Sequence, residues 1–313
     1  MGTIYAIKIA DPPRQLSAND VQIAIDEELR RIDESMSGYR EDSEISRFNA
    51  TASTEWIEVS REVAEVVHAA LEVSEHSAGA FDVTVAPIVR AWGFGSAKHA
   101  PANLPDEQAM REVRKSVGYQ KVHVRLSPSA IKKDVPELTI DLNGIAPGYA
   151  VDRLAVRFDA LHLTNYMIDI GGEIRVRGRN AEQEKWRIAV ERPTDTEAVP
   201  FAILSLRDTS VTTSGEYRHY YDRDGKRYSH TIDPRTARPV DHHLASVVVV
   251  HPQSMYADAW ATAYNVLGAD AGYELANRLG MPVMFILEDE SGQLVSRMAS
   301  GFEKYLAAEE GRL

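Results

Sequence analysis

The sequence contains no cysteine. That absence excludes disulfide bonds, thiolate metal sites, a cysteine nucleophile and lipid attachment through cysteine within these residues. No apolar run approaches the roughly eighteen residues that a membrane-spanning helix needs. Basic residues are outnumbered, with 35 Lys and Arg against 47 Asp and Glu. Because basic residues are not in excess, the sequence argues against a general nucleic-acid-binding protein. An anionic ligand is still compatible with this balance, because a bound cation or local arginines can reverse the field at one site.

The chain of 313 residues is long enough for one large domain or two small ones. It contains no fixed-period repeat, no low-complexity segment and no long linker, so we expect one domain spanning 1–313. Strand and helix patterns are mixed along it, which predicts an α+β fold with a mostly antiparallel sheet and packed helices. A strand pattern follows Met1 and Gly2 at once, so the chain as given shows no signal peptide.

Apolar spacing and capping residues predict the individual elements. Helices are expected over 19–36, 60–76, 106–118 and 271–279, with a short helical turn around 43–48. The first is capped by Ser17 or Asn19 and the short turn by Asp42 or Ser43, while Ser60 and Asp106 begin the second and third helices. Strands are expected over 3–9, 121–126, 137–142, 186–190, 201–206 and 283–287, with hairpins turning at 171–172 and 224–225. The segment SPSAIKKD is expected to connect the strands over 121–126 and 137–142, and the strands over 186–190 and 201–206 are expected to continue the main sheet.

The stretch from Leu244 to Gly268 is the most informative part of the chain. Four consecutive valines, 247–250, are typical of a strand buried on both faces. Pro252 and Ser254 then predict a turn and a helix N-cap, and an alanine-rich helix follows until Gly268 ends it.

On that helix Asp258 and Thr262 are separated by four residues and therefore share one face. A carboxylate beside a hydroxyl, with no His or Cys near, suits a hard cation such as Mg²⁺. The alternative is structural, because an Asp in a first helical turn is favoured by the helix dipole and a Thr can simply pack.

A second candidate is the segment DLNGIAPGYAVDRLA, residues 141–155. Gly144 and Gly148 permit close backbone approach, and Pro147 suits the first helical position. A tight turn that leads into a helix N-terminus can hold phosphate. The segment is neither a Walker A motif nor a full dinucleotide fingerprint, so by itself it is weak evidence.

Other chemistry has less support. His230 lies where a strand ends, close to Asp233, and can act as a general base or a phosphate partner, or only hold a turn. A Ser-His-Asp hydrolase is disfavoured because no GxSxG motif is present. Zinc is disfavoured because His242 and His243 are adjacent and no HExxH motif exists. Four aromatic residues can stack on a flat ligand or belong to the core, namely Tyr39, Phe81, Trp92 and Tyr149.

Several blocks in the same order make the chain similar to the bacterial FAD:protein FMN transferase family, the ApbE-type flavin transferases. They are MSGYREDSEISRFN, AFDVTVAPIVRAWGFG, DLNGIAPGYAVD, IDIGGEIRVRG, TSGEYRHYY, YSHTIDPRTARPV and MYADAWATA. The resemblance covers nearly the whole chain. It implies a T-fold-like α+β architecture and Mg²⁺-dependent transfer of the FMN phosphoryl moiety from FAD to a Thr or Ser hydroxyl of a target flavoprotein, with release of AMP.

The resemblance also implies roles for particular residues. The cation would be held by the side chains of Asp258 and Thr262 and by the backbone carbonyls of Gly144 and Ala261. His230 would deprotonate the acceptor hydroxyl, and Asp258 would serve catalysis through the cation. The positions that correspond to FAD contacts are Met36, Ala80, Phe81, Asp82, Asp141, Pro147 and Ile232.

Three positions depart from the family pattern: Gly38 replaces a usual Thr, Pro147 a usual Lys and Ala237 a usual Gly. Pro147 brings no charge to a pyrophosphate, and Ala237 would be costly where the backbone needs a positive φ. Two alternatives stay open, an Mg²⁺-dependent FAD pyrophosphatase that gives FMN and AMP, and a non-catalytic FAD-binding protein. Family members are typically exported, so a periplasmic or envelope location is expected, with a cytoplasmic one as the alternative.

Overall fold

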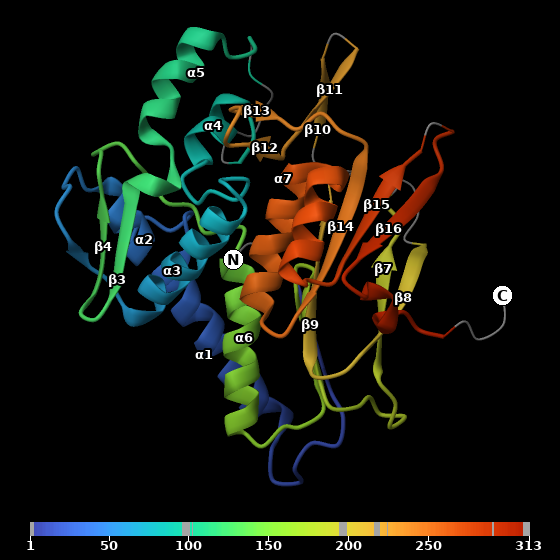
Figure 1. The fold of residues 1–313 in the computed structure, drawn as a ribbon. Helices are drawn as coiled ribbons and strands as arrows, with labels where there is room; N and C mark the ends of the chain where they lie inside the picture. Colours follow the sequence, from blue (N-terminus) through green and yellow to red (C-terminus); the bar gives the residue numbers. More distant parts are fainter. Residues whose placement is uncertain are drawn as a thin grey trace.

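A computed structural model describes residues 3–95, 101, 103–193, 199–215, 220–223, 225–289 and 291–308. Its centre is a seven-stranded sheet in which each neighbouring pair of strands is antiparallel (Figure 1). In spatial order the strands are β1 (Tyr5–Ile9), β5 (Tyr166–Ile170), β6 (Glu173–Arg177), β9 (Thr209–Gly215), β14 (Leu244–His251), β15 (Val283–Glu288) and β16 (Leu294–Ala299). The predicted α+β class with an antiparallel sheet is therefore confirmed.

The valine strand β14 divides two hydrophobic cores. Val247 and Val249 pack in the main core, on the side of the helices. Val248 and Val250 pack in a second core that includes the hairpin of β7 (Trp186–Glu191) and β8 (Pro200–Leu206). Alternate side chains of one strand thus point to opposite faces, and both faces are covered, as the valine run predicts.

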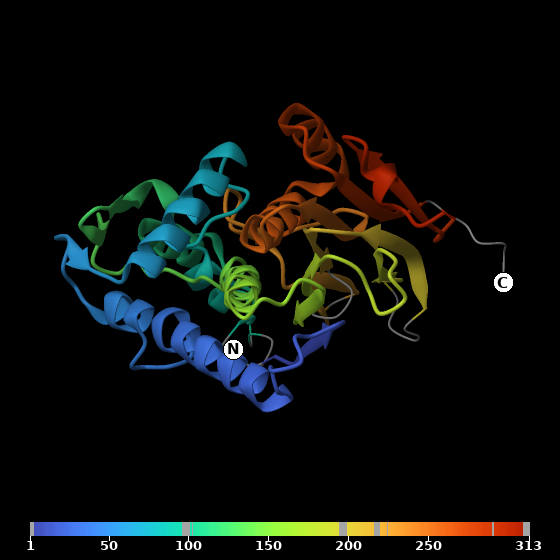
Figure 2. The same cartoon turned by 90° about the horizontal axis from the view of Figure 1, so that it is seen from below.

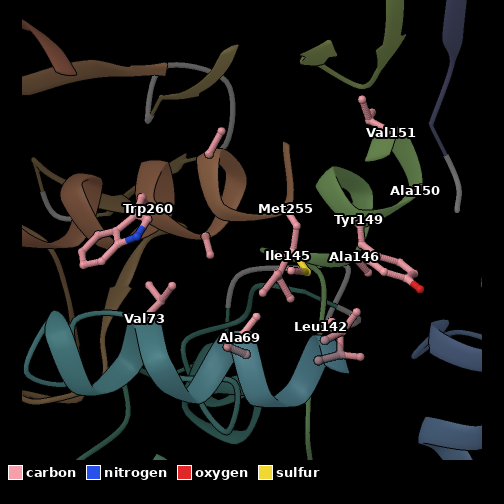
Figure 3. Packing of buried hydrophobic residues seen from close by; sticks show 14 of the residues in the cluster. Ala69, Val73, Leu142, Ile145, Ala146, Tyr149, Ala150, Val151, Met255 and Trp260 are labelled. Carbon is pink, nitrogen blue, oxygen red and sulfur yellow. The ribbon is translucent and has the colours of Figure 1, made fainter. Parts of the chain in front are cut away.

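Four long helices form a layer on one side of the sheet (Figure 2). They are α1 (Ala18–Met36), α3 (Arg61–His76), α6 (Ala146–Ala160) and α7 (Ser254–Leu279). Helices α6 and α7 pack directly on the strands, whereas α1 and α3 pack on α6 and α7. Figure 3 shows Ala69 and Val73 of α3 facing Met255 and Trp260 of α7, so the main core joins these helices.

The short helix α2 (Glu44–Ala50) packs on α1, whereas α4 (Ala86–Ala91) and α5 (Glu107–Val113) pack on each other in a third core with Ile232. The caps follow the prediction, since the side chains of Ser17, Ser43, Ser60 and Asp106 accept hydrogen bonds from the first turns of α1, α2, α3 and α5. Three single-turn 3₁₀ helices lie at Arg114–Ser116, Tyr119–Lys121 and Phe302–Tyr305. Within the described residues no helix is both long and apolar enough to cross a membrane.

Two strand predictions are wrong. Residues 137–142 form no strand; instead β3 (Val122–Leu126) pairs with β4 (Ser129–Lys133), and β4 pairs with β2 (Ile57–Glu58). The strand β4 lies in the segment that was expected to connect the strands over 121–126 and 137–142. Lys133 is nevertheless fully buried, with its Nζ donating to the Leu138 carbonyl at 3.0 Å. Strands β7 and β8 were expected to extend the main sheet but form a two-stranded sheet of their own.

Two hairpins precede β14. The antiparallel pair β10 (Tyr220–Arg223) and β11 (Lys226–Ser229) agrees with the hairpin predicted around 224–225, although residue 224 lies outside the described residues. The pair β12 (Ile232–Asp233) and β13 (Arg238–Pro239) follows immediately. His230 lies in the bend between β11 and β12.

The helix α7 differs from its prediction at both ends. Gln253, not Ser254, precedes the first turn, and the cap comes from α6: the Asp152 carboxylate accepts the Ser254 and Met255 N–H groups, both at 2.9 Å. Gly268 has non-helical angles (φ 75°, ψ 177°), but the helix resumes beyond it and reaches Leu279. The predicted helices before Gly268 and over 271–279 are the two halves of this kinked helix.

Candidate functional site

The Asp258 carboxylate lies in the first half of α7 and is only 5% exposed. Its Oδ2 accepts the backbone N–H of Gly148 at 3.0 Å. No ion pair with Lys, Arg or His is found for it within the described part of the chain. Burial raises the pKa of the Asp258 carboxyl to about 7. A buried carboxylate without a basic partner is costly and is stabilised by any cation that reaches it.

The glycine turn before α6 lies directly against α7. A Cβ placed on Gly144 would be 3.2 Å from the Thr262 Oγ1 atom and 3.2 Å from a ring carbon of Phe81. Gly144, Thr262 and Phe81, which the resemblance assigns to one site, therefore lie together. Thr262 follows Asp258 by one helical turn, so the turn also lies close to that carboxylate.

The oxygen atoms gathered here fit a small hard cation. Asp258 contributes a carboxylate and Thr262 a hydroxyl. The resemblance adds the backbone carbonyl groups of Gly144 and Ala261. In the described ranges no group of three or more His, Cys, Asp or Glu side chains is arranged to hold a metal. A cation would thus rest on mixed oxygen donors, which is the set that the resemblance implies.

Helix α6 fixes the start of α7. A Cβ on Gly148 would lie 2.4 Å from the Ser254 carbonyl oxygen and 2.8 Å from the Asp258 Cβ, so only glycine permits this crossing. One turn later Asp152 caps α7 and pairs with Arg175 of β6 at 2.9 Å. Burial raises the pKa of the Asp152 carboxyl. The position of Asp258 is therefore set by α6 and β6 as well as by its own helix.

A second carboxyl group near Asp258 escaped the sequence reasoning. Glu173 begins β6 just after the Gly171–Gly172 turn, opposite Thr212 of β9. Burial, and then the nearby charge of Asp258, raise the pKa of Glu173 well above its usual value. The Thr212 Oγ1 atom is buried and has no hydrogen-bond partner among the described residues. The only sequence signal for Glu173 was its position after a glycine pair, which predicts a hairpin and no chemistry.

The segment 80–82 lies beside the same turn. The Asp141 N–H donates to the Val83 carbonyl at 2.7 Å and joins the two segments. Asp82 accepts the N–H and hydroxyl of Thr84 and the N–H of Tyr119, and burial raises its pKa. Burial likewise raises the pKa of Asp141. Ala80 and Phe81 are buried.

The other expected FAD positions are more dispersed. Met36 ends α1 and is buried in the main core. Pro147 lies in the first turn of α6, as its φ preference predicts, and is partly exposed. Ile232 belongs to a third core with Trp92, whose indole N–H donates to the Ala237 carbonyl at 2.9 Å. Their roles in binding FAD stay predictions.

An ion pair spans the turn after His230. Asp233 accepts two hydrogen bonds from the Arg235 guanidinium, both at 2.9 Å, so these residues stabilise the turn. Ala237 has φ 58° and is buried. The left-handed backbone at this position is therefore present although the residue is not glycine, at a cost of about 1 kcal/mol. His230 itself is partly exposed.

The aromatic candidates divide between core and surface. Trp92 stacks on Tyr228 with ring centroids 5.8 Å apart, and Tyr149 is buried with its hydroxyl unpartnered among the described residues. Tyr39 is 69% exposed. Phe81 lies against Gly144, since a Cβ placed there would be 3.2 Å from its ring.

Comparison with known proteins covers the whole chain. The family model described as "ApbE family" matches residues 1–285. The FAD:protein FMN transferase of Haemophilus influenzae is 37% identical over 99% of this chain and 90% of its own length, and that of Vibrio cholerae is 38% identical over 98% and 91%. The solved flavin transferase ApbE from Vibrio cholerae superposes with a TM-score of 0.89 at 37% identity, covering 98% of this chain and 96% of that one. The apo flavinyl transferase ApbE of Pseudomonas stutzeri gives 0.87 at 34%, with 99% and 95% covered. The resemblance is thereby confirmed, and the chain belongs to the ApbE family.

Proposed function

We propose that this protein is an FAD:protein FMN transferase that uses Mg²⁺ to transfer the FMN phosphoryl moiety of FAD to a Thr or Ser hydroxyl of a target flavoprotein. Full-length similarity to proteins of that name supports the reaction. The observation that carries the site is the buried Asp258 carboxylate beside Thr262 and the Gly144 turn, without a basic partner in the described structure.

The residues that would hold Mg²⁺ are Asp258 and Thr262 through their side chains and Gly144 and Ala261 through their carbonyl groups. When bound, the cation supplies positive charge that stabilises the phosphoryl groups of FAD during transfer. Gly148 holds one oxygen of Asp258 through its N–H. The other carboxylate oxygen therefore stays available for a ligand.

The FAD site that we propose extends from the Gly144 turn to the residues that correspond to family contacts. They are Met36, Ala80, Phe81, Asp82, Asp141, Pro147 and Ile232. The buried aromatic and aliphatic members can cover the flat parts of the dinucleotide, since Phe81 already lies against the Gly144 turn. Because Pro147 carries no charge, the pyrophosphate depends more on the cation and the backbone than it would with a lysine there.

His230 is the proposed general base. In the transfer step a bond forms between the acceptor hydroxyl oxygen and the FMN phosphorus, and the bond between that phosphorus and the oxygen of AMP breaks. The hydroxyl proton moves to the His230 imidazole, and AMP leaves with its phosphate. A histidine suits this work because its ordinary pKa lies close to neutral pH.

The proposal includes three further expectations, about the domain, the fold type and the location. We propose that residues 1–313 form one catalytic domain, that its sheet and helices are T-fold-like, and that it acts in the periplasm or cell envelope. A single domain agrees with the main hydrophobic core, which includes residues from Val21 near the start of the chain to Ala299 near its end.

The reaction is tested by incubating the protein with FAD, MgCl₂ and a peptide that contains an acceptor threonine. The expected result is a covalent FMN adduct and an equal amount of AMP, both abolished by EDTA. A peptide with valine in place of that threonine is the control and stays unmodified. Free FMN and AMP without adduct would show a pyrophosphatase instead, and an absence of AMP would show a carrier.

A further inference from the structure

Asn265 lies on α7, two helical turns after Asp258, and is only 1% exposed. A spacing of seven residues places it on the same face as Asp258 and Thr262. Its Nδ2 group donates to the Thr231 Oγ1 atom at 3.2 Å and to the Ser214 Oγ atom at 3.3 Å. One buried amide therefore joins α7 to the end of β9 and to the residue that follows His230.

The backbone of Asn265 is also held from outside the helix. Its carbonyl accepts a hydrogen bond from the His242 Nε2 atom at 2.9 Å. Gly268, three residues later, has non-helical angles, and a Cβ there would lie 2.9 Å from the His242 ring. Carbonyl groups just before a helix break need donors outside the helix, and His242 supplies one.

The segment around His230 is fixed on both sides. The Thr231 N–H donates to the Ser229 Oγ atom, and the Val240 N–H donates to the Thr231 carbonyl, both at 3.0 Å. Ser229 and Thr231 are both buried. The Asn265 amide links this fixed segment directly to the helix that carries Asp258 and Thr262.

We propose that Asn265 is a positioning residue that sets the placement of His230 relative to Asp258 and Thr262. The inference rests on the proposed function. A base and a bound phosphoryl group must be aligned for transfer, and a small displacement lowers the rate steeply. The buried Asn265 amide, bonded to two hydroxyl groups, keeps α7 at a fixed distance from the His230 segment. Its Oδ1 atom has no partner among the described residues, so the geometry rests on the Nδ2 side alone.

The test uses two variants that keep the branching and the number of side-chain heavy atoms. Asn265→Leu removes the donor, and Thr231→Val removes the acceptor on the side of His230. Tyr264→Phe is the control: Tyr264 is also fully buried in α7, but its hydroxyl faces the Met281 sulfur at 3.6 Å and not the His230 segment. For each protein, kcat, the KM for FAD and the melting temperature are measured in the peptide transfer assay.

We expect Asn265→Leu and Thr231→Val each to lower kcat by about 10- to 100-fold, with the KM for FAD changed less than about twofold. The double variant should be no slower than Asn265→Leu, because both changes break one link. Tyr264→Phe should keep its kcat within about twofold of the parent even if its melting temperature falls.

An unchanged kcat in Asn265→Leu would overturn the inference. So would additive losses in the double variant, or a rise in the KM for FAD without a fall in kcat. If Asn265→Leu does not fold, Thr231→Val is compared with the parent instead, and a fall in kcat with an unchanged KM for FAD is again the expected result. The parent protein is tested first: if it forms no adduct, the proposed function fails, and that outcome is distinct from a failure of the variants.

Discussion

At the residue scale, the Asp258 carboxyl is a buried acid whose ionisation is coupled to folding. Its pKa is raised by burial from 3.8 to about 7, and the pKa of Glu173 beside it is also raised. In the unfolded chain Asp258 ionises near its ordinary value, while in the metal-free folded protein it keeps its proton to higher pH. Its contribution to stability is therefore present at low pH and is lost as the pH rises through about 7.

This predicts that Asp258→Asn removes a pH-dependent loss of stability. With EDTA present, the melting temperature of the parent should fall between pH 5 and pH 8 relative to that of the variant, because Glu173 is present in both proteins and only the parent must also bury the charge of Asp258. Mg²⁺ should restore the parent at pH 8 and leave the variant unchanged. Two melting curves that run parallel with pH in EDTA would show that Asp258 is not the responsible group.

A second prediction concerns His230. Replacing it with alanine should lower the transfer rate by about 10²- to 10⁴-fold, the usual contribution of a general base. Affinity for FAD, measured by flavin fluorescence, should stay within about twofold, because the imidazole acts on the acceptor and not on FAD. A variant that loses FAD affinity but keeps its rate at saturation would make His230 a binding residue.

At the scale of elements, the crossing of α6 over α7 determines where Asp258 lies. Gly148→Ala would place a Cβ 2.4 Å from the Ser254 carbonyl oxygen, so the two helices must separate. We expect a loss of about 1–3 kcal/mol of unfolding free energy, measured in urea, as for other overpacked positions. The same substitution at Gly38 meets no atom within 4 Å and should change stability by less than about 0.5 kcal/mol. Equal effects at the two glycines would refute the crossing as the cause.

Most helices and the central strand were predictable because their signals are local. Ser17, Ser43 and Ser60 cap helices that begin directly after them. The strand β4 was missed because a lysine buried at 0% exposure disguises its pattern. The cap of α7 was assigned to Ser254, whereas the acceptor is Asp152 on another helix. Bonds between distant segments leave no local signal.

The candidate site was likewise predictable only where its residues lie on one element. The pair Asp258 and Thr262 follows from helical spacing, since both lie on one element. The proximity of Gly144 to Thr262 came from the resemblance alone, and the structure shows this contact without testing its role. Glu173 and Asn265 were missed, because each reaches the site through tertiary packing that no motif encodes.

At the scale of the whole molecule, stability should be unequal between the centre and the outer hairpins. The strand β14 pairs on both sides and is buried on both faces, whereas β10 and β11 pair only with each other in the described structure. Hydrogen exchange followed by mass spectrometry should show β14 among the slowest segments, exchanging only through global unfolding, and β11 among the fastest. Comparable rates in the two would contradict this assignment of the core.

The sheet order also has a consequence for synthesis. The edge strand β1 pairs with β5, and α1 to α6 lie between them in the chain. At ordinary translation rates β1 must therefore wait several seconds or more before its partner leaves the ribosome. During that interval the side chains of Ile7 and Ile9 have no sheet to join. The proposed Mg²⁺ ligands Asp258, Ala261 and Thr262 all lie on α7, so the proposed site can be complete only after α7 has been synthesised, and FAD cannot guide the earlier steps of folding.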